Sequence, residues 1–388
     1  MKQKWMTGLG LILALAMMLA ACGNQGAAPQ GNDGKPNAAL EAAAPIALEK
    51  DADGDAEIMS TGPHGEAAVA ATTLELTAEE VEKLREGNYK AAIVLHYAGN
   101  DWSTAQLDGL KTTFAKMGIE VIAETDAQFK SEKQVSDIET VMARKPDVII
   151  GLPVDPVSTA GAFKKAAEAG AKIVFMDNVA DGLEHGTHYA SVVSADNYGN
   201  GVKAADILAE KLGGKGKIGV IYHDADFFVT KQRVEAFEQT MKEKYPEIEI
   251  VARGGIVEPS DGEKVASALL TKHPDLDGMF VVWDVPAEGA LAAVRTAGKK
   301  DLVITTSDLG TNVALEIAKD GIVKGLGSER PYDQGVAEAI LAGYALLGKE
   351  TPSYVVVPPL GVTKDNVLEG WKSVYRQEAP DLIKNALK

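Results

Sequence analysis

Cysteine is nearly absent from this sequence, since Cys22 is the only one among 388 residues. A lone cysteine cannot form a disulfide within the chain, and its position excludes a thiolate nucleophile or a cysteine metal site from the folded body. Basic residues are outnumbered as well, and the formal net charge is −17. Because nucleic-acid binding requires a basic surface, this charge argues against nucleic acid as a partner.

The motifs of several enzyme and cofactor classes are also missing. The chain contains no Gly-x-Ser-x-Gly sequence and no clustered histidine triad. The glycine-rich stretch 213–217 follows an expected helix and precedes a strand, the reverse of a phosphate-binding loop. Three aspartates at 51–55 mimic the start of a calcium loop, but no glutamate completes it, which favours a solvated linker. We therefore expect no enzyme activity, no cofactor and no metal.

The start of the chain has the pattern of an export signal. Lys2 and Lys4 precede a short apolar run at 9–18, and Leu19-Ala-Ala-Cys22 follows it. This tetrapeptide resembles the lipobox of bacterial lipoproteins, which implies that Cys22 is lipidated. An ordinary signal peptide in which Cys22 is incidental is the alternative. We expect an exported protein, anchored to the cell membrane by an N-terminal lipid and facing the outside or the periplasm.

The stretch 23–75 is rich in alanine, glycine, asparagine, aspartate and proline and has no sustained periodicity. Such a composition buries too little apolar surface to offset the entropy lost on ordering. We predict a disordered acidic linker over 23–75, which follows a signal peptide over 1–22.

The remainder alternates apolar strands with amphipathic helices. A capping box at 77–80 predicts a short helix, and the apolar run that begins at Ala91 predicts a buried strand followed by a helix over 103–117. Further strands are expected at 119–124, 147–153, 172–177 and 189–194, with helices at 131–143 and 157–169 between them. A second series of strand–helix units runs from 197 to 347.

Two such series exceed one comfortable core, which predicts an α/β fold of two doubly wound parallel-sheet lobes joined by a hinge. We expect the chain to pass between the lobes near 191–196, 329 and 354–359. The N-terminal lobe would comprise 76–192 plus about 330–356, and the C-terminal lobe 193–329 plus about 357–388.

Ligands of open parallel sheets bind beyond the carboxyl ends of the strands. His96, Asn100 and Trp102 follow the first expected strand, and aspartates at 177, 284 and 308 each follow a later apolar run. These aspartates accept hydrogen bonds from ligand hydroxyls or serve as helix N-caps. At another strand end, Phe227 or Phe228 is a candidate for the wall of the cleft.

From about residue 89 to 375, the motifs and their order resemble the ribose-type periplasmic binding proteins, the type I sugar-binding components of bacterial ABC importers. The matching stretches are Gly-Asn-Asp-Trp at 99–102, Pro-Val-Asp at 153–155, Met-Asp-Asn at 176–178, Ser-Ala-Asp-Asn-Tyr-Gly at 194–199, Lys-Gln-Arg-Val-Glu-Ala-Phe at 231–237, His-Pro-Asp-Leu-Asp-Gly-Met-Phe at 273–280, and Asp308.

The resemblance implies a site formed by both lobes, which close over the ligand. The implied ligand-binding residues are His96, Asn100, Trp102, Asp177, Asn178, Arg233, Trp283, Asp284, Asp308 and Glu329. Two of them have competing interpretations. Arg233 either binds ligand or pairs on the surface with Glu235 or Asp226, and Trp283 either stacks on ligand or packs under a loop.

The resemblance further implies a monomeric protein that carries a small neutral sugar or polyol to an ABC permease. His96 stands where this family has a small polar residue, and Asn178 stands where it often has arginine. These differences favour a polyol, another pentose or a related hydroxylated compound over ribose. The alternative with the same fold is a receptor that presents its ligand to a chemotaxis or sensor-kinase partner.

Overall fold

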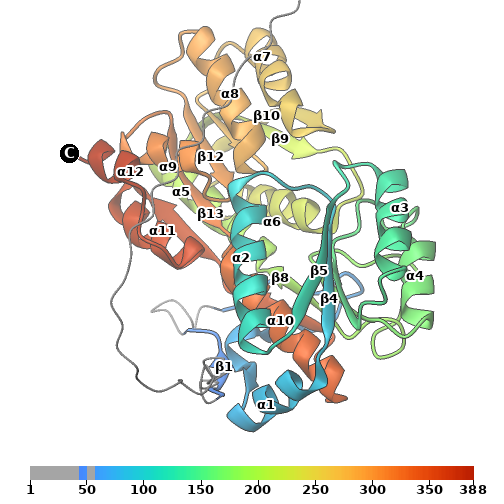
Figure 1. Ribbon diagram of the computed structural model, residues 1–388. Helices are drawn as coiled ribbons and strands as arrows, with labels where there is room; N and C mark the ends of the chain where they lie inside the picture. The colour runs from blue at the N-terminus through green and yellow to red at the C-terminus, as the bar shows by residue number, and fades with distance from the viewer. Residues whose placement is uncertain (1–42, 50–56) are drawn as a thin grey trace, which may run out of the picture. The chain divides into compact units, whose positions relative to one another are not determined.

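Two largely parallel β-sheets organise the part of the chain that the computed structural model describes, residues 43–49 and 57–388 (Figure 1). The predicted export signal with Cys22 and the aspartates at 51–55 lie outside the described residues. Among the described residues, no helix combines the length and apolar character that a membrane span requires.

The first sheet has seven parallel strands and is covered by helices on both faces. Its inner strands are buried on both sides, which explains their continuous apolar sequences, whereas β5 at one edge is half-exposed. The strand order is β2 (Val69–Ala70), β14 (Tyr354–Val357), β8 (Ser191–Ala195), β7 (Lys172–Met176), β6 (Val148–Gly151), β4 (Lys90–Leu95) and β5 (Glu120–Asp126). One face packs on α1 (Ala78–Gly87), α2 (Asp101–Lys116) and α10 (Pro331–Leu347), and the other on α3 (Ser131–Met142) and α4 (Ala160–Glu168) (Figure 1).

The second sheet has six strands, all parallel except for the last pair. Their order is β10 (Ile248–Ile256), β9 (Gly216–His223), β11 (Gly278–Val281), β12 (Val303–Ser307), β13 (Val323–Ser328) and β15 (Leu360–Thr363). The surrounding helices are α5 (Asn197–Lys211), α6 (Phe228–Lys244), α7 (Gly262–Lys272), α8 (Asp284–Thr296), α9 (Thr311–Ala318), α11 (Val367–Tyr375) and α12 (Asp381–Ala386). The predicted fold class, two parallel-sheet α/β lobes, is thereby confirmed.

The chain passes between the two sheets three times. It leaves the first sheet at Asp196, between β8 and α5, and returns through Glu329, which follows β13 and precedes α10. It crosses again between β14 and β15, at the two prolines 358–359. Each lobe is therefore assembled from stretches that are distant in sequence, and the crossings lie side by side.

The prediction of disorder over 23–75 is wrong for residues 43–49 and 57–75. β1 (Ile46–Ala47) pairs antiparallel with β3 (Glu75–Leu76), and β2 extends the edge of the first sheet beside β14. Ile46 and Leu74 are buried among residues of α1 and α10. Met59 is exposed, but the other large apolar residues of this segment are buried or half-buried against the folded body.

Asp196 fixes part of this segment to the first crossing. Its carboxylate accepts hydrogen bonds from the backbone N–H of Met59 (2.8 Å) and Ser60 (3.0 Å), from the Ser60 hydroxyl (2.7 Å) and from Gly199 N–H (2.8 Å). The Ser60 hydroxyl also accepts a bond from Tyr198 N–H at 3.0 Å. Asp196 is fully buried, so these bonds replace the water that its carboxylate loses.

Ser60→Ala should lower the free energy of unfolding by about 2 kcal/mol, because it removes a bond to a buried carboxylate and an acceptor for Tyr198 N–H. Urea denaturation measures the loss. Ser158→Ala is the matched control, because the Ser158 hydroxyl makes the same kind of bond to Asp155 in an exposed loop. Equal effects of the two substitutions would show that residues 57–62 are not packed on the crossing.

Candidate ligand-binding site

A cavity lies between the lobes, at the carboxyl ends of their strands. It encloses about 530 Å³ of atom-free space, part of it open to solvent. Of the predicted ligand residues, those that line it are His96, Asn100, Trp102, Asp177, Arg233, Trp283, Asp308 and Glu329. They come from both lobes and from the crossing at Glu329, so one cavity brings together residues that are up to 233 positions apart in the sequence.

Two predicted residues do not line this cavity. Asn178 is buried, and its side-chain amide has no hydrogen-bond partner among the described residues. Asp284 instead borders a small void beside Trp102 and Asp308, and its Oδ1 accepts a bond from Val285 N–H at 2.8 Å. Asp284 is the first residue of α8 and Trp283 occupies the N-cap position, so the alternative that Asp284 is a helix N-cap is wrong. Ligand contact by any of the ten residues stays a prediction.

The prediction missed several residues that line the cavity. They are Tyr97, Phe129, Leu152, His223, Val229 and Thr230, and Phe227, named as one of two candidates, lies there too. Tyr97 directly follows His96, and His223 is the last residue of β9. Phe129 lies in the loop after β5. The strand-end rule, applied to every strand in turn, would have found these three.

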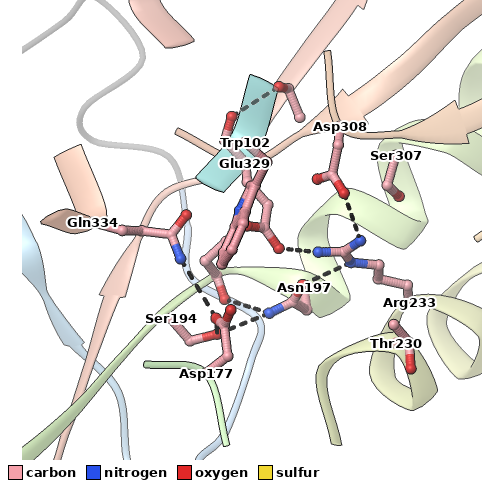
Figure 2. Close-up of polar contacts among 12 residues, drawn as sticks. Trp102, Asp177, Ser194, Asn197, Thr230, Arg233, Ser307, Asp308, Glu329 and Gln334 are labelled. Carbon is pink, nitrogen blue, oxygen red and sulfur yellow. Dashed lines mark hydrogen bonds and ion pairs between the residues drawn. The ribbon is translucent and has the colours of Figure 1, made fainter. Parts of the chain in front are cut away.

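Arg233 lies at the centre of the polar part of the site (Figure 2). Its guanidinium donates to Asn197 Oδ1 at 2.8 Å and to Asp308 Oδ2 at 3.1 Å, and it forms an ion pair with Glu329. The other Glu329 oxygen accepts the indole N–H of Trp102 at 2.6 Å. Arg233 is only 4% exposed, so the alternative that it pairs on the surface is wrong. The buried cation thus joins groups of the second lobe to a crossing, and Glu329 extends the link to Trp102 of the first lobe.

Asp177 forms a second branch of the network. It accepts the Ser194 hydroxyl at 2.7 Å, and the Ser194 oxygen in turn accepts Asn197 Nδ2 at 2.9 Å (Figure 2). Gln334 Nε2 lies 3.4 Å from the same Asp177 oxygen. Burial raises the pKa of Asp177 to about 6, against the opposing effects of the Ser194 bond and the Arg233 charge. The effect of burial on this carboxylate therefore outweighs that of the donors and the cation beside it.

Asp177 and Asp308 do not act as helix N-caps, which was the alternative to a binding role. Both have left-handed backbone conformations, with φ of 52° and 65°. The residue that caps α9 is Gly310, and α5 is capped by Asp196. Left-handed conformations of non-glycine residues are strained and concentrate at functional sites. One oxygen of Asp308, Oδ1, is buried without a hydrogen-bond partner among the described residues.

Aromatic rings form the other part of the wall. His96 stacks on Phe227 at 5.6 Å and meets Phe129 edge-on at 5.0 Å, while Trp283 meets His223 edge-on at 5.2 Å. Burial lowers the pKa of His96 to about 3, with a further contribution from His223, so the imidazole is neutral. A neutral imidazole offers one donor and one acceptor, and Nδ1 of His96 has no partner among the described residues.

The arrangement suits a small molecule with hydroxyl groups on its edges and apolar C–H faces. Carboxylates accept hydrogen bonds from hydroxyl groups, a neutral imidazole donates one and accepts one, and flat rings cover apolar faces. The described residues contain no cluster of three or more histidine, cysteine or acidic side chains placed to hold a metal ion.

The sequence and the fold are similar to those of known proteins. The model of the periplasmic binding protein domain family matches residues 91–351. The ribose import binding protein RbsB of Bacillus subtilis is 29% identical over 251 residues, which cover 64% of this chain and 79% of that protein. The D-apiose import binding protein of Actinobacillus succinogenes is 26% identical, over 65% of this chain and 80% of its own length.

Solved structures agree with this assignment. An ABC transporter periplasmic solute-binding protein of Actinobacillus succinogenes with bound D-allose superimposes with a TM-score of 0.64 and 28% identity, and covers 72% of this chain and 99% of its own. The family model spans well over half of the sequence, and its fold is the one described above. The chain therefore belongs to the periplasmic binding protein family, as a ribose-type member with the type I fold.

Proposed function

We propose that this protein is an exported, lipid-anchored solute-binding protein that captures a small sugar or polyol and delivers it to an ABC permease. The observation that carries the proposal is the buried network around Arg233, which links Trp102, Asp308 and Glu329 at one cavity between two lobes. The anchor rests on the lipobox-like sequence that ends at Cys22. Relatives named for ribose, D-apiose and D-allose support the ligand class.

Capture would proceed by hinge closure. The lobes would divide as 76–192 plus about 330–356 and 193–329 plus about 357–388, and the three crossings would act as the hinge. In the open form the strand ends of both lobes are reached by water, and in the closed form they share the ligand. A ligand favours closure only by as much as it binds the closed form better than the open one.

The ligand is proposed to be uncharged and to be a polyol or a sugar other than ribose. The cation of Arg233 is already matched by Asp308 and Glu329, so it leaves no positive charge for an anionic guest. The free acceptor of Asp308 and the neutral His96 suit hydroxyl groups. His96, which departs from the family pattern and lines the cavity, argues for a ligand other than ribose.

A receptor for a chemotaxis or sensor-kinase partner would use the same fold and the same cavity. Deletion of the chain should abolish uptake of the ligand if the protein serves a permease. If uptake continues while the response to the ligand is lost, the receptor function is favoured instead.

Isothermal titration against pentoses, hexoses, pentitols and tetritols should identify at least one neutral compound that binds with a dissociation constant of about 10 μM or lower, equivalent to roughly 7 kcal/mol. The protein is first unfolded in denaturant and refolded, so that any ligand that co-purified is removed. Inorganic phosphate and acetate are the charged controls. The ligand class is refuted if no neutral polyhydroxy compound binds to refolded protein.

Arg233→Lys should weaken binding of the best compound about 100-fold, because an ammonium cannot reproduce the fork of bonds to Asn197, Asp308 and Glu329. Arg253→Lys is the matched control, since Arg253 forms an exposed pair with Glu238 in the same lobe. Titration measures both variants, and circular dichroism verifies that they are folded. An Arg233→Lys variant that is folded and binds as tightly as the Arg253→Lys control would remove Arg233 from the site.

A further inference from the structure

Outside the cavity, a single carboxylate reaches from one lobe to the start of a helix in the other. Oδ2 of Asp101 accepts hydrogen bonds from the backbone N–H and from the hydroxyl of Thr311, both at 2.7 Å. Asp101 is the first residue of α2 in the first lobe, and Thr311 is the first residue of α9 in the second. The backbone N–H groups of a first helical turn have no partner within their own helix, so Asp101 supplies a cap that α9 needs.

α9 cannot supply this cap itself. Its N-cap residue is Gly310, which makes no side-chain capping bond. A Cβ atom at position 310 would overlap Oδ2 of the buried Asp284, so a side chain there would have to displace that carboxylate. The serine, threonine, asparagine and aspartate side chains that usually cap helices are thereby disfavoured at this position.

The Asp101 carboxylate is not needed to cap its own helix, α2, and can therefore cap α9. The Asn100 side chain accepts a bond from Ser103 N–H at 2.9 Å, which caps α2. The Asp101 carboxylate therefore lies beside the N-terminal ends of two helices, and both ends carry partial positive charge that favours an anion.

The contact also ties together two loops that line the cavity. Asp101 stands between Asn100 and Trp102, and Thr311 follows Asp308 by three residues. Asp101 and Thr311 lie on different lobes, so the opening motion proposed above would separate them and return both to water. On that proposal the contact would form only when the lobes are closed, and it would stabilise the closed form without touching the ligand.

We propose that Asp101 is a positioning residue that sets how long the ligand is retained, by capping α9 across the cleft when the lobes close. This inference rests on the proposed function, because it requires closure over a ligand. The capping bond stabilises the closed form and not the open form. A group changes the apparent affinity through closure only if it stabilises one of these two forms more than the other.

Asp101→Ala should raise the dissociation constant of the best sugar or polyol about tenfold, the usual effect of removing a helix cap. Because the contact forms after the ligand has entered, the dissociation rate should rise by the same factor, and the association rate should stay within about twofold. Stopped-flow fluorescence measures both rates, since Trp102 and Trp283 line the cavity. Asp101→Asn keeps a capping oxygen without the charge and should restore most of the affinity.

Two further variants separate the cap from other effects. Asp108→Ala removes a partly exposed carboxylate from the same helix and should leave both rates unchanged. Thr311→Val removes the hydroxyl donor but keeps the backbone donor, so it should weaken binding by about threefold. In the double variant Asp101→Ala with Thr311→Val, binding should be no weaker than in Asp101→Ala alone.

The proposal is overturned if Asp101→Ala binds within twofold of the unmodified protein, or if Asp101→Asn is as weak as Asp101→Ala, because the lost charge on α2 would then explain the effect. If the unmodified protein binds no sugar or polyol, the proposed function fails separately. The cap is then tested without ligand, by the distance between spin labels at Lys165→Cys and Lys272→Cys, two exposed sites on opposite lobes, in a Cys22→Ser background. Asp101→Ala should shift that distance to longer values, and an unchanged distribution would overturn the proposal.

Discussion

The guanidinium of Arg233 is the interaction on which the site depends, because it allows two carboxylates to share a buried space. Asp308 and Glu329 lie on either side of it, and each is 9% exposed or less. Without a cation between them, burial and mutual repulsion would disfavour both charges. Burial still raises the pKa of Asp308 against the opposing effect of the Arg233 charge, and burial together with the Asp308 charge raises the pKa of Asp284. The site therefore contains more acceptor capacity than it can satisfy by itself.

The topology explains how these groups meet. In parallel sheets all strands end at the same edge, so Asp177 after β7 and Asp308 after β12 reach the facing edges of two sheets. Glu329 lies on a crossing, where it contacts Trp102 from one lobe and Arg233 from the other. The crossing at Asp196 is in turn held by the segment near Ser60, so the regions that would bend and the regions that would bind are adjacent.

Much of the fold and much of the site could be predicted from the sequence, because both follow local rules. The capping box at 77–80 is present, with Thr77 and Glu80 bonded reciprocally, and the apolar runs form the parallel strands. The packing of residues 57–75 could not be predicted, because composition averages hide isolated apolar residues whose partners lie elsewhere. Phe129 was missed because it follows a half-exposed strand. The bond between Asp101 and Thr311 could not be predicted, because it joins residues 210 positions apart and a local sequence pattern contains no information about such a contact.

Some interactions between the lobes would favour the closed form, and some buried groups would favour the open form. Together they would make closure depend on ligand. Oδ1 of Asp308 and Nδ1 of His96 are buried without partners among the described residues, and burial raises the pKa of Asp177, so these groups would favour opening if the lobes move as proposed. On the same proposal, the Asp101 cap and the Trp102–Glu329 bond would favour closing with or without ligand. A ligand whose hydroxyl groups bond to Asp308, His96 and Asp177 would remove the cost of burying these groups. The stabilisation from the Asp101 cap and the Trp102–Glu329 bond would remain. Contacts outside the cavity would therefore lengthen the time for which the ligand is retained. They would not close the protein without ligand, as long as the free energy they contribute is smaller than the cost of burying polar groups without partners.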